Sequence, residues 1–347
     1  MSTHQRQLSV AGFERVIHFE NPQSHLSAII AIHSTNLGPA CGGIRMLPYR
    51  SENEALEDVL RLAKSMSYKS ALAAIGFGGG KSVIIHNPEK KTPALFQTFG
   101  ECVETLGGKY IAAKDMNIES ADLVEVKKKT KHVLGIEGQP DSSGDPSPVT
   151  ARGLFRGLEA TVEEFSKSKN LSGLKVAIQG IGHVGYSFAE MLFKAGAELW
   201  VADIDENRLR VAEEKLKAKR VPVEEIYATR CDVFAPCAQG AILNRDTIPK
   251  LKCKAVVGSA NNQLATGADG SYLHEKGILY APDYAVNSGG IINIFIEYEG
   301  YNQQKAFKKA DEIYQTLKEI FKRAREKKTA PFIIADQLAE ERLYGKR

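Results

Sequence analysis

Two lysines lie around a run of glycines, a combination that suits an acid bearing a carbonyl group. Gly78-Gly79-Gly80 immediately precede Lys81, and Lys69 lies twelve residues before Lys81. Glycines leave the backbone bare and let it approach a ligand closely. One lysine can hold a carboxylate as a point charge while the other acts on the carbonyl. Taken alone, the same residues also fit a surface loop with a solvated lysine, so the interpretation depends on the rest of the chain.

A predicted helix carries the upstream lysine. Ser51 and Glu54 have the spacing of a capping box, and apolar residues then recur at helical intervals as far as Met66. Lys69 falls near the end of this helix, to one side of the apolar face. A lysine at a helix end also complements the helix dipole, so its position by itself leaves both a structural and a binding role open.

Short apolar runs on either side of the lysines predict strands. The run at 26–33 is rich in isoleucine and ends at a glycine-containing stretch, 38–43, that predicts a loop. The glycine run before Lys81 predicts a second loop, followed by a short strand at 83–85. A further strand at 110–113 runs directly into Lys114 and Asp115.

The second half contains the complete signature of a dinucleotide-binding fold. A strand at 175–179 is followed at once by Gly-x-Gly-x-x-Gly at 180–185, a helix, and a strand at 198–202. The first two glycines permit a tight turn and the approach of a pyrophosphate, the third packs helix against strand, and the helix N-terminus favours an anion. The predicted cofactor-binding residues are Gly180, Ile181, Gly182, His183, Val184, Gly185 and Asp203.

The acid after the second strand indicates which dinucleotide is bound. Asp203 lies where a carboxylate holds ribose hydroxyls, and its charge would repel a 2′-phosphate, so NAD is favoured over NADP. Arg208 is close in sequence and keeps NADP open. Amides at 258–263 follow another predicted strand and can reach a nicotinamide ring, although such residues are also typical of turns.

These elements predict an α/β protein of two domains separated by a cleft. The stretch 138–148 is dense in Pro, Gly, Ser and Asp and marks the boundary. We expect residues 1–143 to form an N-terminal α/β substrate domain that also mediates oligomerisation. Residues 144–328 are expected to form a Rossmann-type NAD-binding domain, and a C-terminal helix at about 329–347 is expected to return to the first domain.

Composition excludes several classes of function. The 347 residues carry a net charge of only +4, which does not argue for nucleic acid. Five cysteines without a CxxC pair support neither a disulfide framework nor a zinc site, so no metal is expected. The start lacks the apolar core of a signal peptide, and no apolar run approaches the ~20 residues that cross a bilayer. We therefore expect a cytoplasmic protein without a membrane partner.

Seven motifs together resemble the Glu/Leu/Phe/Val amino-acid dehydrogenase family, and its leucine dehydrogenase branch most closely. The resemblance extends from about Phe13 to Arg342. The motifs that carry it are GPACGGIRMLPY (38–49), LAKSMSYKSALAAIGFGGGKSVI (62–84), GDPSPVTARGLFRG (144–157), GIGHVG (180–185), CDVFAPCAQGAI (231–242), GSANNQL (258–264) and YAPDYAVNSGGIIN (280–293).

The resemblance implies reversible oxidative deamination of an L-amino acid to a 2-oxo acid and ammonia, with NAD(P) accepting hydride. By motif match, Lys81 corresponds to the catalytic lysine and Lys69 to the lysine that holds the substrate carboxylate. Asp115 corresponds to the acid that works on the amine and the attacking water. Thr150 and Asn262 match positions near the nicotinamide carboxamide. The family is typically multimeric, so a homo-oligomer is expected.

The residues at the expected substrate pocket favour an aliphatic side chain. The resemblance places the following residues at the substrate: Cys41, Gly42, Gly43, Ala113, Ile291 and Ile294. Glutamate-specific members have a cation where this chain has Cys41, and a second carboxylate buried there unpaired would be costly. A branched-chain acid, such as leucine, valine or isoleucine, is therefore expected. The run 115–118 resembles the tryptophan dehydrogenase branch, so an aromatic substrate remains an alternative.

Two other functions fit the sequence less well. A catalytically silent NAD-binding protein would have no chemical need for Lys69, Lys81 and Asp115 together. A 2-hydroxy-acid dehydrogenase usually combines a histidine with an arginine clamp. Arg45 and several histidines are present, but none forms a comparable constellation with a glycine loop beside the cofactor.

Overall fold

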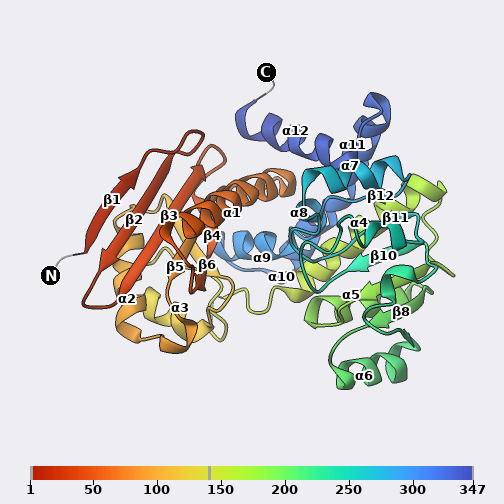
Figure 1. Ribbon diagram of the computed structural model, residues 1–347, viewed down its shortest axis with the longest axis horizontal. Coiled ribbons are helices and arrows are strands. Elements are labelled where there is room, and N and C mark those ends of the chain that lie inside the picture. The colour runs from red at the N-terminus through yellow and green to blue at the C-terminus, as the bar shows by residue number, and fades with distance from the viewer. Residues whose placement is uncertain (1–2, 140–141, 346–347) are drawn as a thin grey trace. The chain divides into compact units, whose positions relative to one another are not determined.

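The structure is a computed structural model that describes residues 3–139 and 142–345. It divides into two compact units, each of which is drawn from more than one stretch of the chain (Figure 1). Unit 1 comprises Met1–Asp145, Ile294–Asn302 and Ala339–Arg347, and unit 2 comprises Pro146–Asn293 and Gln303–Leu338.

Unit 1 is built on a mixed six-stranded sheet. Its strands are β1 (His4–Leu8), β2 (Arg15–Asn21), β3 (Leu26–Ser34), β4 (Ala40–Leu47), β5 (Gly78–Ile85) and β6 (Tyr110–Lys114). The order across the sheet is β1-β2-β3-β5-β4-β6. The pairs from β1 through β3 to β5 are antiparallel, whereas β4 runs parallel to both of its neighbours, β5 and β6.

Helices cover both faces of this sheet. The long helix α1 (Glu52–Ala73) begins as predicted, because the Ser51 hydroxyl accepts a hydrogen bond from Glu54 N at 3.1 Å. It packs on one face through a cluster that includes Val59 and Val83. The other face packs against α2 (Pro93–Glu104) and α3 (Ser120–Lys127), which follow a short 3₁₀ turn at Pro88–Lys90.

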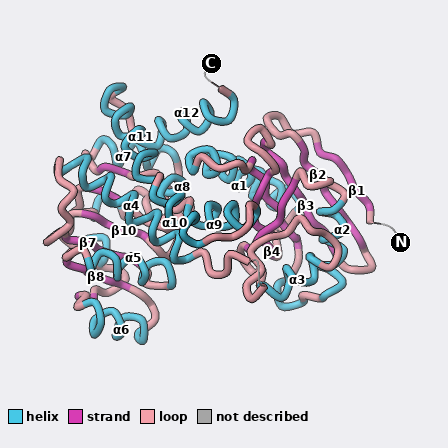
Figure 2. The backbone as a smooth tube through the Cα atoms, turned by 180° about the vertical axis from the view of Figure 1, so that it is seen from behind, coloured by secondary structure: helices cyan, strands magenta, loops and turns pink. Residues whose placement is uncertain are grey.

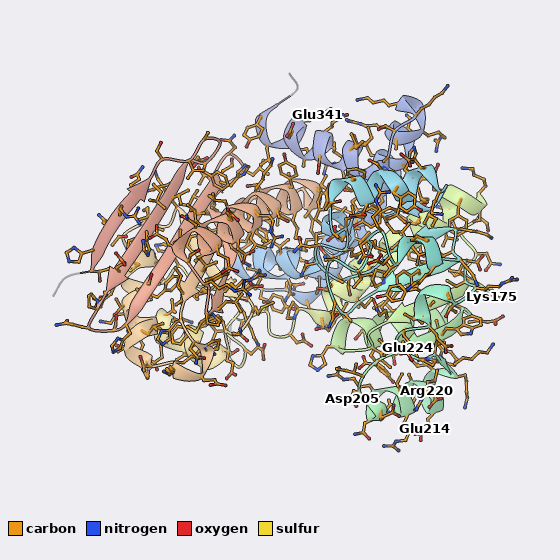
Figure 3. All side chains as sticks on the ribbon, in the orientation of Figure 1. Lys175, Asp205, Glu214, Arg220, Glu224 and Glu341 are labelled. Atoms are coloured by element: carbon orange, nitrogen blue, oxygen red, sulfur yellow. The ribbon has the colours of Figure 1, made fainter. Side chains whose placement is uncertain are left out.

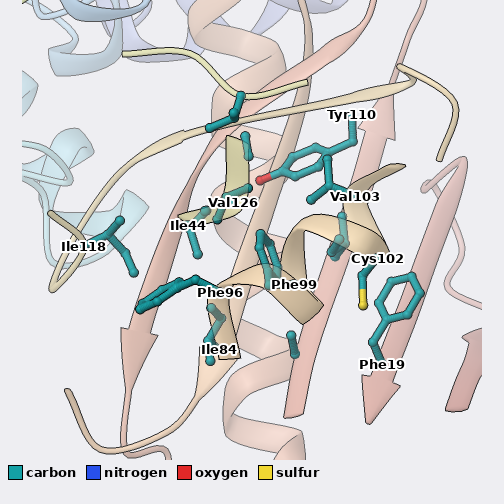
Figure 4. Packing of buried hydrophobic residues seen from close by; sticks show 14 of the residues in the cluster. Phe19, Ile44, Ile84, Phe96, Phe99, Cys102, Val103, Tyr110, Ile118 and Val126 are labelled. Carbon is teal, nitrogen blue, oxygen red and sulfur yellow. The ribbon is translucent and has the colours of Figure 1, made fainter. Parts of the chain in front are cut away.

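The larger core of unit 1 lies on the face covered by α2 and α3. Figure 4 shows Phe96 and Phe99 of α2 packed among Ile44, Ile84 and Tyr110, which all project from the sheet. Each of these five side chains is at most 1% exposed. Their burial removes a large apolar area from water and fixes the sheet against the two helices.

The glycine run is not the loop that the sequence suggested. Gly78–Gly80 form the start of strand β5, and residues 40–43 of the other predicted loop, 38–43, form the start of β4. A Cβ built on Gly79 would lie 2.1 Å from Ser67 N of α1, and one on Gly80 would lie 2.9 Å from the Tyr110 ring. The glycines are therefore required for close packing of the strand against its protein neighbours.

Unit 2 contains a six-stranded parallel sheet. Its strands are β7 (Lys175–Gln179), β8 (Glu198–Ala202), β9 (Lys219–Arg220), β10 (Val233–Pro236), β11 (Ala255–Val256) and β12 (Leu279–Tyr280). The order β12-β11-β10-β7-β8-β9 has the first strand at the centre and one reversal between β7 and β10. This is the doubly wound order of dinucleotide-binding folds, so the predicted two-domain α/β class is confirmed.

The helices of unit 2 precede, connect or follow these strands along the chain (Figure 2). They are α4 (Ser147–Ser166), α5 (His183–Lys194), α6 (Glu206–Leu216), α7 (Gly267–Glu275), α8 (Asp283–Val286), α10 (Gln303–Asp311) and α11 (Ile313–Lys327), with 3₁₀ turns at Ile226–Ala228 and Ile248–Lys250. Helix α4 packs against α5, α10 and α11. Within the described residues, no helix is both long and apolar enough to span a bilayer.

Helix α9 (Gly289–Tyr298) is divided between the units. Its first turn lies against α4, where a Cβ built on Gly289 would be 2.4 Å from Val149 O. Its second half belongs to unit 1, where the Phe295 ring meets Phe77 edge to face at 5.2 Å. Glu297 accepts hydrogen bonds from Gly135 N and Ser143 N, at 2.9 and 2.8 Å. The segment 294–302 therefore lies outside the unit to which the range 144–328 would assign it.

The last helix, α12 (Pro331–Tyr344), is divided in the same way. In unit 2, its Asp336 carboxylate accepts a hydrogen bond from the Tyr284 hydroxyl. In unit 1, its Glu340 accepts one from the Tyr68 hydroxyl at 2.7 Å, and Arg342 donates to Ala71 O at 3.0 Å. Only the part of the helix from residue 339 onward is thus assigned to the first unit, rather than the whole segment 329–347.

Candidate active site

Strand alternation brings the chemically active side chains of unit 1 to one face of the sheet. Val83 packs toward α1, so Lys81, two residues earlier on β5, projects to the same face. On β4, Ile44 packs toward α2, so its neighbour Arg45 projects toward α1. Asp115 follows directly after the end of β6. Because β4 lies between β5 and β6, these three side chains converge beside α1.

Lys81 and Asp115 form an ion pair at the centre of this group. Lys81 Nζ lies 3.0 Å from Asp115 Oδ2, and the two side chains are 6% and 27% exposed. Burial lowers the pKa of Lys81 below its usual value even though the Asp115 carboxylate favours the charged amine. Burial by itself would raise the pKa of Asp115, but the cations of Lys81 and Arg45 together lower it.

Arg45 and Asp58 belong to the same network, and sequence reasoning did not find them. Arg45 Nε donates to Asp115 Oδ2 at 2.9 Å, and its Nη1 donates to Asp58 Oδ2 at 3.0 Å. The Tyr49 hydroxyl donates to the same Asp58 oxygen at 2.8 Å. Strand β4, helix α1 and the end of β6 each contribute a member, so no local spacing could have revealed the group. The sequence signal for this group was Arg45, two residues after the predicted loop at 38–43.

Gly42 and Gly43 make this packing possible. A Cβ built on Gly43 would lie 2.6 Å from the Cβ of Asp115, and one on Gly42 would lie 1.8 Å from Gly80 O. A side chain at either position would displace a strand or the carboxylate itself. The structure thus gives both glycines a packing function, and their contact with substrate stays a prediction.

Lys69 lies on the same side of α1 as Asp58. It is half-buried, eleven residues after Asp58, which corresponds to about three turns of the helix. Side chains at that separation share a helix face. Helix α1 packs on β5, the strand of Lys81. Its role in holding a carboxylate remains a prediction.

The predicted specificity residues of unit 1 are uncharged, and Cys41 and Ala113 are buried. Cys41 is fully buried, and burial raises its pKa to about 12, so its thiol stays neutral near physiological pH. Ala113 is 7% exposed and pairs with Gly43 in the β4–β6 ladder. The Ile294 side chain approaches Gly135, where an added Cβ would lie 2.9 Å from its Cδ1. Ile291 lies three residues earlier on the same face of α9.

Unit 2 has a cavity of about 380 Å³ lined by the glycine motif, at the reversal point of its sheet. The three motif glycines have distinct environments. Gly180 has φ +92° and turns the chain. A Cβ on Gly182 would have Arg208 Nη1 as its nearest neighbour, at 3.8 Å, so this glycine leaves open space for a ligand. A Cβ on Gly185 would lie 2.1 Å from Gly180 O, so this glycine allows the helix to pack closely.

The start of α5 fits a pyrophosphate in this cavity. His183, Val184 and Gly185 line the cavity and form the first turn of the helix, and no side chain caps it at Gly182. The free amides and the helix dipole both favour an anion. The residues present therefore fit the phosphate groups of a dinucleotide.

Asp203 organises the adjacent loop. Its Oδ2 accepts a hydrogen bond from Ile181 N at 2.7 Å, and its Oδ1 accepts one from Asp205 N at 2.9 Å. Asp205, labelled in Figure 3, caps α6 by accepting from Asn207 N at 2.9 Å. Arg208 of α6 lies 4.0 Å from Asp203 Oδ1, so the carboxylate that would hold the ribose is already fixed in orientation.

Thr150 and Asn262 have different environments within unit 2. Thr150 is nearly buried in the first turn of α4, donates to Pro146 O at 2.9 Å and lies beside Gly290. Asn262 is exposed in the loop after β11, with φ +53°. The structure also adds Asn287, which the site prediction omitted. Its Nδ2 donates to Asn261 Oδ1 at 2.9 Å and thereby orders the amide-rich loop.

Family models and sequence relatives agree with this architecture. Residues 13–132 match the dimerisation domain of Glu/Leu/Phe/Val dehydrogenases, and residues 199–331 match the Glutamate/Leucine/Phenylalanine/Valine dehydrogenase model. A leucine dehydrogenase of Geobacillus stearothermophilus is 46% identical over 96% of this chain and 92% of its own length. A phenylalanine dehydrogenase of Lysinibacillus sphaericus is 50% identical over 91% of this chain and 84% of its own.

A solved structure shows the same fold. The crystal structure of L-tryptophan dehydrogenase from Nostoc punctiforme superposes with a TM-score of 0.87 at 42% identity, covering 96% of both chains. The fold and the two sites define an amino-acid dehydrogenase that uses NAD as its cofactor. The chain belongs to the Glu/Leu/Phe/Val dehydrogenase family. Among the described residues, no cluster of His, Cys, Asp and Glu side chains has a geometry that could hold a metal ion.

Proposed function

We propose that this enzyme catalyses the reversible oxidative deamination of a branched-chain L-amino acid, leucine and also valine or isoleucine, in the catabolism of these acids. In this proposal unit 1 binds the amino acid and unit 2 binds NAD. The single observation that supports it most is the buried Lys81 amine paired with Asp115 on a sheet face that also carries the uncharged Cys41 and Ala113.

The residues of unit 1 have the types that this reaction requires. Bound NAD would supply the hydride acceptor for the substrate Cα, and loss of that hydride would leave an iminium on the substrate. Water then adds to the iminium carbon, which forms a C–O bond as the water loses a proton. The nitrogen next gains a proton, and the C–N bond breaks to release ammonia as the new hydroxyl loses its proton and becomes the carbonyl. Lys81 exchanges a proton with the oxygen that becomes the carbonyl, and Asp115 exchanges protons with the amine and the water. Lys69 holds the substrate carboxylate.

The lowered pKa of Lys81 supports this assignment. An ordinary lysine, with a pKa of 10.5, is almost fully charged near neutral pH and cannot accept a proton. Enclosure of Lys81 increases the neutral fraction that can act as a base. The nearby carboxylate of Asp115 limits this effect, so the two groups exchange protons as a coupled pair.

The character of the pocket supports an aliphatic side chain. Cys41, Ala113, Ile291 and Ile294 carry no charge, so none of these predicted substrate-binding residues could pair with the buried carboxylate of a glutamate side chain. Apolar pockets discriminate by only ~1–3 kcal/mol per methylene, so activity on several branched-chain acids is expected.

An aromatic L-amino acid is the second candidate substrate. It is favoured by the similarity to phenylalanine and tryptophan dehydrogenases, at 50% and 42% identity. The small side chain of Cys41 would enlarge the pocket, whereas Ile291 and Ile294 would reduce it. The balance between these residues decides between the two substrate classes.

We also infer that the enzyme is a homo-oligomer that associates through unit 1. The match to a family dimerisation domain over residues 13–132 supports this inference. Strand β1 is an edge strand of the sheet and most of its residues are exposed. Light scattering of the purified protein should give a mass that is a multiple of 38.0 kDa.

The substrate test is a set of initial rates of NAD reduction. The panel is L-leucine, L-valine, L-isoleucine, L-phenylalanine, L-tryptophan and L-glutamate, with L-lactate as the negative control. Highest kcat/KM on the branched-chain acids supports the proposal. Highest kcat/KM on phenylalanine or tryptophan selects the second candidate, and absence of any rate while NAD still binds contradicts both.

A further inference from the structure

Arg45 occupies a central position between the candidate catalytic pair and helix α1. Its Nε donates to Asp115 Oδ2 at 2.9 Å, and its Nη1 donates to Asp58 Oδ2 at 3.0 Å. The side chains of Arg45 and Asp58 are 15% and 17% exposed. A guanidinium holds two carboxylates in a fixed direction because its donors are coplanar, so Arg45 connects Asp115 rigidly to α1.

Both cations act on the same oxygen of Asp115. Lys81 Nζ lies 3.0 Å from Oδ2, the oxygen that also accepts from Arg45 Nε. Among the residues that the structure describes, none donates a hydrogen bond to Oδ1. The carboxylate thus has one oxygen held by two charged donors and one oxygen left for other partners, on a side chain that is 27% exposed.

We propose that Arg45 is the positioning residue of Asp115, fixing Oδ2 together with Lys81 so that Oδ1 is the oxygen that exchanges protons with the substrate amine and the attacking water. This inference rests on the proposed function of the site. A carboxylate with only one charged partner could rotate and present either oxygen to Lys81. Two donors on one oxygen oppose that rotation.

Arg45 is not itself a clamp for the substrate carboxylate. Its Nε and Nη1 are both engaged by protein carboxylates. The Asp58 oxygen that accepts from Arg45, Oδ2, also accepts from the Tyr49 hydroxyl at 2.8 Å, whereas the exposed Arg61 donates to the other oxygen, Oδ1. Asp58 Oδ2, fixed by Tyr49, therefore orients Arg45, and Arg45 orients Asp115.

Because Arg45 and Lys81 share Asp115 Oδ2, the charge of Arg45 also affects the protonation of Lys81. Three charged groups act on the Lys81 amine, namely Asp115 after β6, Arg45 on β4 and Asp58 on α1. The thiol of Cys41, on β4, is also near the amine but is neutral. The positive charge of Arg45 lowers the pKa of Lys81, whereas both carboxylates raise it. Removal of the guanidinium should therefore shift the midpoint of Lys81 ionisation to higher pH.

The test compares Arg45→Gln and Arg45→Lys with wild type. We expect Arg45→Gln to lower kcat for the best substrate by about ten- to a hundred-fold, since a small misplacement of a catalytic group has an effect of that order. Its KM should change less than three-fold. The ascending limb of the pH–rate profile, which reports deprotonation of Lys81, should move to higher pH. Arg45→Lys keeps the positive charge, so the midpoint of this limb should lie between those of wild type and Arg45→Gln.

Arg61→Gln is the matched control. It also removes a cation from Asp58, but Arg61 is 54% exposed and bonds Asp58 Oδ1, the oxygen that does not contact Arg45. Its kcat and pH profile should stay within two-fold of wild type. Unchanged kcat and an unmoved limb in Arg45→Gln would overturn the inference, as would a loss confined to the melting temperature or to KM.

A measurement without turnover separates this inference from the proposed function. Reductive methylation of Lys81 at a series of pH values, quantified by mass spectrometry of its peptide, reports the ionisation of the amine directly. The midpoint should lie at higher pH in Arg45→Gln than in wild type, and an unchanged midpoint contradicts the link. Absence of amino-acid-dependent NAD reduction by wild type contradicts the proposed function, and the methylation midpoint still decides the role of Arg45.

Discussion

Lys81 and Asp115 differ in how much solvent reaches them although they touch. The amine side chain is 6% exposed and the carboxylate side chain is 27% exposed, with 3.0 Å between Nζ and Oδ2. Burial disfavours the charged form of both groups, but it lowers the pKa of Lys81 overall, whereas the cations of Lys81 and Arg45 outweigh it at Asp115 and hold the carboxylate as an anion. The pair is therefore arranged to contain one group that can lose a proton and one that can accept it.

Removal of the Lys81 amine should abolish turnover. We expect Lys81→Ala to lower kcat by at least about a thousand-fold, the upper part of the range for general acid–base groups. The matched control is Lys91→Ala, which breaks another lysine–aspartate pair of unit 1, with Asp122 at 2.6 Å. Stopped-flow and steady-state rates on the best substrate measure the effect. Near-normal turnover of Lys81→Ala would remove Lys81 from the mechanism.

The pH profile should report the same amine. Because the pKa of Lys81 is lowered from 10.5, its neutral form appears at lower pH than for a free lysine. The rate should fall as pH decreases through this pKa, since the amine becomes protonated and can no longer accept a proton. The ascending limb of kcat/KM should thus have its midpoint below 10.5 and should be missing from the residual activity of Lys81→Ala. A limb at or above the ordinary lysine value would contradict the assignment.

Enlarging the side chain at position 41 should narrow the substrate range. Cys41 is fully buried, so Cys41→Leu adds volume directly to the predicted pocket. We expect kcat/KM for phenylalanine and tryptophan to fall at least about ten-fold relative to leucine. Cys102, also buried but within the core on the other face of the sheet, provides the control Cys102→Ala. If Cys41→Leu and Cys102→Ala changed the ratio of kcat/KM for aromatic substrates to kcat/KM for leucine equally, Cys41 would have no special role in specificity.

A side chain at Gly182 should prevent NAD binding without unfolding the protein. A Cβ there meets only Arg208 Nη1 at 3.8 Å, so Gly182→Val is tolerated sterically but fills the space next to the amides of α5. We expect the Kd for NADH, measured by fluorescence, to rise at least about a hundred-fold. Gly267→Val also has open space around it but lies at the start of α7, outside the cavity, and should bind NADH normally. Tight NADH binding by Gly182→Val would place the cofactor elsewhere.

The candidate cofactor site was more predictable from sequence than the candidate catalytic network. Gly180, Gly182 and Gly185 act within six consecutive residues between one strand and one helix, so their spacing alone carries the geometry. Arg45 and Asp58 meet only because a strand and a helix pack together, which no local pattern encodes.

The glycine run was interpreted wrongly for a related reason. The sequence shows that Gly79 lacks a side chain, but it does not show that Ser67 of α1 fills the adjacent space. Glycines are typical of loops, and here close packing between helix and strand selects them instead. The divided helices α9 and α12 were likewise beyond prediction, because their two halves have partners that are distant in sequence.

The division of α9 and α12 also determines when unit 1 can be completed during synthesis. Phe77 lacks its aromatic neighbour Phe295, and Ser143 lacks the Glu297 carboxylate, until the ribosome has made most of the chain. Tyr68 must wait longer still for Glu340. The segments that complete unit 1, Ile294–Asn302 and Ala339–Arg347, are thus translated after most and after all of unit 2, respectively, so unit 1 cannot make its full set of contacts until nearly the whole chain has been synthesised.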